Sequence, residues 1–110
     1  YEGGVIAPGI NLSIKNLSQE TAMLPIINLK SHQKSYGKNT IEALNAGFVW
    51  GYEGLINNII DKIISRSKIK YKILLTGGYA NFFKKMIKKK VIIDQDITIK
   101  GIANAYKELV

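Results

Sequence analysis

The sequence has 110 residues, an apolar fraction of 46% and a formal net charge of +8, which bounds it to one compact domain with a modest hydrophobic core. The absence of cysteine excludes a disulfide framework and a thiolate zinc site. No signal peptide or stop-transfer segment is recognisable. Because the first residue is Tyr1 rather than methionine, we expect the chain to be a piece of a longer protein or a processed product.

The first predicted elements are a short strand and a helix, separated by a Pro8-Gly9 turn. Residues 3–7 form the candidate strand, which has no earlier segment to pair with, so we expect an incomplete sheet. Pro25 ends the helix that follows, because the residue before a proline is driven towards extended geometry. The helical spacing is carried by Ile10, Ile14, Leu17 and Thr21.

Two short segments connect this helix to the next one. Residues 25–29 form either a brief strand or an extended crossing segment, and residues 31–36 form a polar loop. The loop contains the only histidine, His32, which has no other metal ligand near it in the sequence. We therefore interpret His32 as structural or incidental.

The most regular stretch of the chain runs from Gly37 to Ser65, where a Gly-Lys-Asn-Thr turn leads into one long helix. Either Asn39 or Thr40 can cap its first turn, because a short side-chain oxygen satisfies N–H groups that the helix leaves unpaired. An apolar stripe follows the helical period for about six turns. It consists of Ile41, Leu44, Phe48, Tyr52, Leu55, Ile59 and Ile63.

The same helix carries a second stripe of small residues at helical spacing, namely Ala43, Gly47, Gly51 and Gly54. Each glycine inside a helix costs about 1 kcal/mol relative to alanine, so three of them need a reason. A transmembrane dimer is disfavoured, because Glu53, Asp61 and Lys62 interrupt the apolar run. We predict that the glycine face is a packing surface.

The remaining elements alternate between strands and helices. Residues 71–76 form the best strand, the Gly77-Gly78 pair follows it, and a helix covers residues 79–88. A short strand at residues 91–93 and a helix from 99 to 109 complete the chain. Strand, glycine pair and helix is a layout in which backbone can lie against a ligand, although an isolated Gly-Gly pair more often marks a plain turn. The order of elements indicates an α/β domain.

Acidic residues precede the last helix. We interpret Asp94 and Asp96 as loop acids near the start of that helix rather than as a metal pair, and Thr98 as its cap. The helix is predicted to bury one apolar face, consisting of Ile102, Ala105, Tyr106 and Leu109.

Ten basic residues and no acidic one lie between positions 62 and 90, a pattern that invites a nucleic-acid interpretation. Two features oppose it. Fifteen of the sixteen basic residues are lysine, whereas arginine is the usual reader of bases and phosphates. No aromatic ladder interleaves with the lysines as a single-strand binder requires. We therefore interpret the cluster as a solvated basic surface and expect no nucleic-acid partner.

Five motifs occur in the order and spacing of the C-terminal half of type III pantothenate kinase, which the chain resembles over essentially its whole length. They are the N-terminal run Tyr-Glu-Gly-Gly-Val-Ile-Ala-Pro-Gly at residues 1–9, Thr21-Ala22-Met23-Leu24-Pro25, Gly37-Lys38-Asn39-Thr40, Leu75-Thr76-Gly77-Gly78 and Asp96-Ile97-Thr98-Ile99-Lys100-Gly101. The resemblance implies a ribonuclease H-like domain of the actin, sugar-kinase and Hsp70 superfamily, the chain being the C-terminal domain of a two-domain kinase. It also implies phosphorylation of pantothenate in coenzyme A biosynthesis by a cytoplasmic homodimer that uses ATP, Mg²⁺ and a monovalent cation, K⁺ or NH₄⁺.

The resemblance also implies roles for particular residues. Thr40 matches a substrate-contacting threonine, and Thr76, Gly77 and Gly78 match a turn near the adenosine. Gly47 and Gly51 lie where the family forms its dimer contact. The family's phosphate loop, catalytic aspartate and cation-binding turn have no counterpart in this sequence, so no catalytic residue and no metal ligand is assigned to it. The alternative function is a non-enzymatic binding or regulatory module, a degenerate kinase half with a nucleic-acid role.

Overall fold

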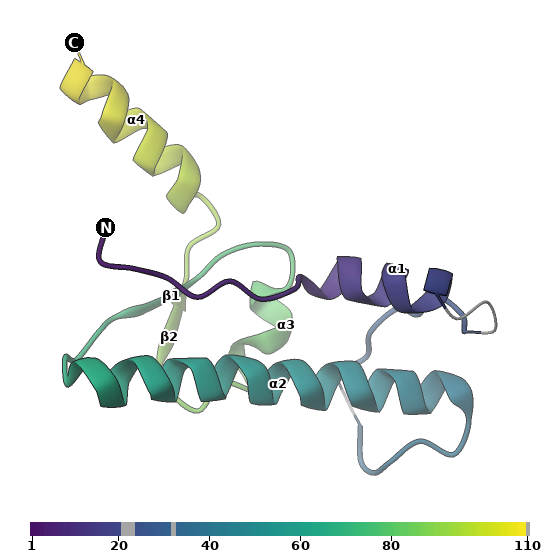
Figure 1. Ribbon diagram of the computed structural model, residues 1–110. Coiled ribbons are helices and arrows are strands. Elements are labelled where there is room, and N and C mark those ends of the chain that lie inside the picture. Colours follow the sequence, from purple (N-terminus) through teal and green to yellow (C-terminus); the bar gives the residue numbers. More distant parts are fainter. Residues whose placement is uncertain (21–23, 32, 110) are drawn as a thin grey trace. The chain divides into compact units, whose positions relative to one another are not determined.

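The computed structural model describes residues 1–20, 24–31 and 33–109, which form an α/β arrangement (Figure 1). The chain divides into two compact units, Tyr1–Ile60 and Asp61–Val110. In chain order the elements are α1 (Ile10–Glu20), α2 (Thr40–Ser67), β1 (Ile73–Leu75), α3 (Ala80–Lys84), β2 (Val91–Ile93) and α4 (Ile97–Leu109).

The core of the first unit lies where α1 and the segment after it meet α2. Its buried apolar residues are Ile10, Ile14, Ile27, Ala46 and Val49. The two helices are also joined through Tyr52, whose hydroxyl lies 2.7 Å from Ser13 Oγ and donates to the carbonyl of Pro8 at 2.9 Å. This polar contact fixes the start of α1 against the middle of α2.

The predicted strand at residues 3–7 is wrong, because the backbone there forms no ladder. A strand needs a neighbour to satisfy its N–H and C=O groups, and no described segment pairs with this one. Residues 25–29 likewise form no strand, and of their side chains only Ile27 is buried. The Thr21-Ala22-Met23 part of the second motif and His32 lie outside the described residues.

The long helix is confirmed, and α2 starts at Thr40, where the sequence placed its first turn. The buried face differs from the predicted stripe, however. The buried residues of α2 are Asn45, Ala46, Val49 and Asn57, whereas Ile41 is 60% exposed and Ile63 is 43% exposed. The covering segments pack one residue further round the helix than the stripe of large apolar side chains, which is left half-buried or exposed.

The second unit is built on a two-stranded parallel sheet. β1 pairs with β2 in the register Ile73 to Val91, Leu74 to Ile92 and Leu75 to Ile93, and α3 packs against β2. Both strands were predicted. The helix predicted over residues 79–88 is shorter, because α3 ends at Lys84 and the chain then turns, with Met86 N–H donating to Phe83 O at 2.9 Å.

The core of the second unit is small. Its buried apolar residues are Ala80, Phe83, Ile87 and Val91. The ring of Phe83 stands edge-on to that of Phe82 with 4.8 Å between centroids, and the ring of Tyr79 packs on both. Leu74 and Ile92, which are paired in register, share a face of the sheet and are both exposed.

Two expectations for the last helix are wrong. None of the residues of α4 is buried, although Ile102, Ala105, Tyr106 and Leu109 were predicted to face a core. Thr98 is not its cap, because α4 starts at Ile97 and Lys100 N–H already bonds to Asp96 O at 2.9 Å. In the described part of the chain, no helix is long and apolar enough to cross a membrane.

Candidate functional site

The start of α2 is fixed by two reciprocal hydrogen bonds. Asn39 Oδ1 accepts the N–H of Glu42 at 2.9 Å, and Glu42 Oε2 accepts the N–H of Lys38 at 3.0 Å. Asn39 thereby satisfies an N–H of the first turn that has no partner within the helix, and Glu42 satisfies the N–H of Lys38, which precedes the helix. Asn39 is therefore the cap, and Thr40 is the first helical residue, with an exposed side chain.

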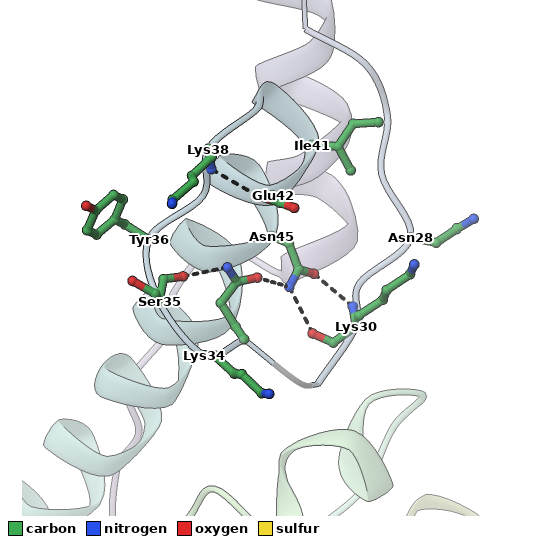
Figure 2. A pocket seen from close by; sticks show the side chains of 10 residues that line it. Asn28, Lys30, Lys34, Ser35, Tyr36, Lys38, Ile41, Glu42 and Asn45 are labelled. Atoms are coloured by element: carbon green, nitrogen blue, oxygen red, sulfur yellow. Dashed lines mark hydrogen bonds between the residues drawn. The ribbon is translucent and has the colours of Figure 1, made fainter.

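A pocket of about 410 Å³ lies beside this helix start (Figure 2). It is formed by the segment between α1 and α2 on one side and by the first turns of α2 on the other. Its lining residues are Asn28, Lys30, Gln33, Lys34, Ser35, Tyr36, Lys38, Ile41, Glu42 and Asn45. Thr40 does not line the pocket but directly precedes Ile41, which does.

The buried amide of Asn45 holds the wall of the pocket together. Asn45 Oδ1 accepts the N–H of Lys30 at 2.8 Å, and its Nδ2 donates to Lys30 O at 3.0 Å and to Gln33 Oε1 at 2.9 Å (Figure 2). Gln33 Nε2 in turn donates to Ser35 O at 2.6 Å. One side chain of α2 thus fixes the backbone of the preceding loop, which otherwise has no regular structure.

The charges around the pocket suit a small polar ligand. Lys30, Lys34 and Lys38 supply ammonium donors, and Glu42 supplies a carboxylate that already accepts a backbone N–H. Hydroxyl and amide groups of Ser35, Tyr36 and Asn28 add neutral hydrogen-bonding capacity. These groups can bind and orient a ligand.

The second predicted site is the turn Thr76-Gly77-Gly78, which directly follows β1. Gly77 has φ +98°, a backbone conformation that residues with a side chain rarely adopt. All three residues are exposed, and a Cβ built on Gly77 or Gly78 would meet nothing within 4 Å. A flat ring could therefore approach this backbone closely. The helix that follows, α3, has five residues and contributes no separate anion site.

The loop between β2 and α4 contacts this turn. The side-chain amide of Gln95 makes two hydrogen bonds to Gly77, at 3.2 and 3.0 Å. The neighbouring Asp94 pairs with Lys100, its Oδ2 lying 2.9 Å from Nζ. The hydrogen bond from Lys100 lowers the pKa of Asp94, and the same bond raises the pKa of Lys100, so both groups are charged at neutral pH.

The described residues provide no evident metal site. No group of three or more His, Cys, Asp or Glu side chains comes together in residues 1–20, 24–31 and 33–109. The exposed glycine turn, in contrast, is compatible with a nucleotide.

The glycine stripe of α2 is open in this structure. Gly47, Gly51 and Gly54 are exposed, and a Cβ built on any of them would meet nothing within 4 Å. Trp50, on the same side of the helix, is 44% exposed. No described segment of this chain packs closely on the glycines. Contacts within the chain therefore do not explain why α2 keeps three glycines that destabilise a helix relative to alanine.

Sequence reasoning missed three residues that shape these sites, namely Gln33, Asn45 and Gln95. For Asn45 a signal existed, because asparagine is a poor helix former and this one interrupts the run from Leu44 to Ala46. For Gln33 and Gln95 there was none. Their bonds reach 12 and 18 residues along the chain.

Comparison with known proteins gives one consistent family. The family model described as type III pantothenate kinase matches residues 1–62. A type III pantothenate kinase of Pelagibacter ubique (strain HTCC1062) is 50% identical over 105 residues, covering 96% of this chain and 42% of that relative. Relatives with the same name from Ruegeria sp. (strain TM1040) and Roseobacter denitrificans (strain ATCC 33942 / OCh 114) are each 36% identical over 107 residues. The chain thus spans about two fifths of the length of the curated relatives that it matches.

Proposed function

The chain belongs to the type III pantothenate kinase family, and we propose that it is the C-terminal part of an ATP-dependent kinase that phosphorylates pantothenate in the cytoplasm. The observation that carries the proposal is the family match over residues 1–62, a range that contains the pocket and most of α2. The parallel β1–α3–β2 unit is compatible with the sheet of a ribonuclease H-like domain.

In this proposal the chain supplies binding surfaces rather than the chemical step. Phosphoryl transfer depends mainly on positioning and on charge stabilisation. The Thr40 hydroxyl, exposed at the start of α2, would bind pantothenate, and the turn of Thr76, Gly77 and Gly78 would lie against the adenosine of ATP. Bound Mg²⁺ and a monovalent cation would neutralise phosphate charge.

The proposal can be tested in a chimera. The segment of the Pelagibacter ubique relative that aligns with this chain, 42% of its length, is replaced by the chain itself. We expect the chimera to phosphorylate pantothenate with ATP, measured by coupled release of ADP. A folded chimera without activity, beside an active parent enzyme, would favour the alternative of a non-enzymatic module.

Within the chimera, Thr40→Val is expected to raise the KM for pantothenate several-fold with little change in melting temperature. A lost hydrogen bond to a neutral ligand group costs about 0.5–1.5 kcal/mol, up to roughly tenfold in affinity. Folding should tolerate the change, because the cap of α2 is the side chain of Asn39.

Asn39→Ala is the matched control for this prediction. It removes the cap and is expected to cost about 0.5–2 kcal/mol of stability while leaving the KM for pantothenate nearly unchanged. The two variants should therefore separate binding from folding. A large fall in melting temperature with an unchanged KM in Thr40→Val would show that Thr40 stabilises the fold and does not bind pantothenate.

The proposal extends to a homodimer in which Gly47 and Gly51 of α2 face the partner subunit. It is supported by the open glycine stripe and by Trp50, which is exposed beside it. Close approach of a second helix would explain why glycines that each cost about 1 kcal/mol are present there.

Gly51→Leu is expected to convert a dimer of the 110-residue chain into a monomer. The new side chain meets no atom of this chain within 4 Å of its Cβ, so it should disturb a partner rather than the fold. Sedimentation velocity measures the change. Gly101→Leu, at another exposed glycine with open space around it, should leave the dimer intact. A monomeric unmodified chain, or an unaffected Gly51→Leu dimer, would contradict this interface.

A further inference from the structure

One side chain satisfies both backbone polar groups of Gly77. The N–H of Gly77 donates to Gln95 Oε1 at 3.2 Å, and Gln95 Nε2 donates to Gly77 O at 3.0 Å. The orientation of the amide follows from chemistry, because only its oxygen accepts and only its nitrogen donates. Gln95 thus holds the glycine turn from a loop 18 residues further along the chain.

The loop that carries Gln95 is itself fixed on both sides. Asp94 N–H donates to Leu75 O at 2.9 Å, which extends the pairing of β1 and β2 by one bond. The carboxylate of Asp94 accepts the N–H of Asp96 at 3.1 Å and the Nζ of Lys100 at 2.9 Å. Gln95 therefore projects from a backbone that is also held by bonds other than its own to Gly77.

The turn has a physical need for such support. Glycine loses more conformational freedom on folding than any other residue, and two glycines stand here in succession without side chains to pack. A mobile turn would have to be ordered when a ligand binds, and that ordering would reduce the affinity. A turn held beforehand avoids this cost.

We propose that Gln95 is a positioning residue that pre-organises the Thr76-Gly77-Gly78 turn for the nucleotide. The inference rests on the proposed function, which assigns this turn to the adenosine of ATP. Gln95 acts through the backbone of Gly77 and does not touch the nucleotide. The N–H of Gly77 donates to Gln95, and its carbonyl accepts both Gln95 Nε2 and the N–H of Ala80. Direct hydrogen bonds to the adenosine of the nucleotide would therefore come from Thr76 and Gly78 instead.

The first measurement tests whether Gln95 stabilises the conformation of the turn, and it does not depend on enzymatic activity. In Gln95→Ala, amide hydrogen exchange at Gly77, followed by NMR in the 110-residue chain, is expected to become about three- to tenfold faster, the effect of one lost hydrogen bond. Gln95→Glu keeps an acceptor for the Gly77 N–H but loses the donor to its carbonyl, so exchange should change less. Gln19→Ala, the same substitution at an exposed glutamine of α1, is the control.

The second measurement tests whether Gln95 affects nucleotide binding, by determining the KM for ATP in the chimera with the Pelagibacter ubique relative. Gln95→Ala is expected to raise the KM for ATP about three- to tenfold, with the KM for pantothenate and kcat nearly unchanged. A merely structural role would lower the amount of active enzyme and move kcat instead. Gln95→Glu should raise the KM for ATP as well, because it loses the bond from Gln95 Nε2 to the Gly77 carbonyl and adds a negative charge beside the turn that is proposed to hold a negatively charged nucleotide.

The outcomes separate this inference from the proposed function. Unchanged exchange at Gly77 in Gln95→Ala would overturn the role of Gln95 in holding the turn. Faster exchange with an unchanged KM for ATP would overturn its role in nucleotide binding. A chimera that is inactive with the unmodified chain would count against the proposed function and against the nucleotide role together, while the exchange data would still decide whether Gln95 holds the turn.

Discussion

Phe83→Ala is expected to unfold the second unit, residues 61–110, because it removes the largest side chain of a core with four buried apolar residues. Truncating a buried phenylalanine to alanine typically costs about 3–5 kcal/mol. A unit of this size has a total stability of about 2–8 kcal/mol at ordinary values per residue. The lost free energy is therefore comparable to the total stability of the unit. A two-stranded sheet by itself is only marginally stable and cannot compensate for the loss.

The measurement is amide hydrogen exchange in β1 and β2, because the bonds of this small sheet report on the second unit alone. We expect protection at residues 73–75 and 91–93 to be lost in Phe83→Ala. Phe82→Ala is the matched control, since Phe82 lies in the same ring cluster but is only half-buried, and it should retain most of the protection. Equal protection in the two variants would show that burial of Phe83 does not stabilise the sheet.

Asn45→Ala is expected to lower the stability of the first unit, residues 1–60, by about 2–4 kcal/mol, because three hydrogen bonds contribute about 0.5–1.5 kcal/mol each. The side chain is 7% exposed, so the groups it leaves behind lose a partner in a place that water reaches poorly. The loop of Lys30 and Gln33 should detach from α2, and the pocket should lose its wall.

Urea denaturation followed by the fluorescence of Trp50 measures this effect, because Trp50 is the only tryptophan and lies in the same unit. Asn58→Ala, an identical substitution at an exposed position of α2, should change the midpoint little or raise it slightly, since alanine is the better helix former. Coincident midpoints for Asn45→Ala and the unmodified chain would contradict the role assigned to this network.

The long helix, its starting point and the strand pair were predictable, because their signals are local. Helical spacing, a capping residue ahead of Glu42 and short apolar runs act within a few residues, and α2, β1 and β2 formed where those signals stand. The family was also recognisable from the sequence, because five motifs occur in the family's order along the chain. The comparisons with known proteins confirmed the family.

The sequence alone did not determine which face of each helix is buried or which segments pair as strands. The apolar stripe of α2 was identified from helical spacing, but the buried residues of this helix are Asn45, Ala46, Val49 and Asn57. Asn45, for example, is hydrogen-bonded to the backbone of a loop 15 residues away in the sequence. The apolar face of α4 and the segment at residues 3–7 show the same limit, since burial and strand pairing need a partner that periodicity does not supply.

The two candidate sites divide in the same way. Thr40 and the Gly77-Gly78 turn stand out in the sequence, because a helix start and a glycine pair are local features. The side chains that hold the adjoining backbone, Asn45 and Gln95, were identified only from the tertiary structure. Their bonds join segments 15 and 18 residues apart, and only folding determines which such polar groups come within hydrogen-bond distance.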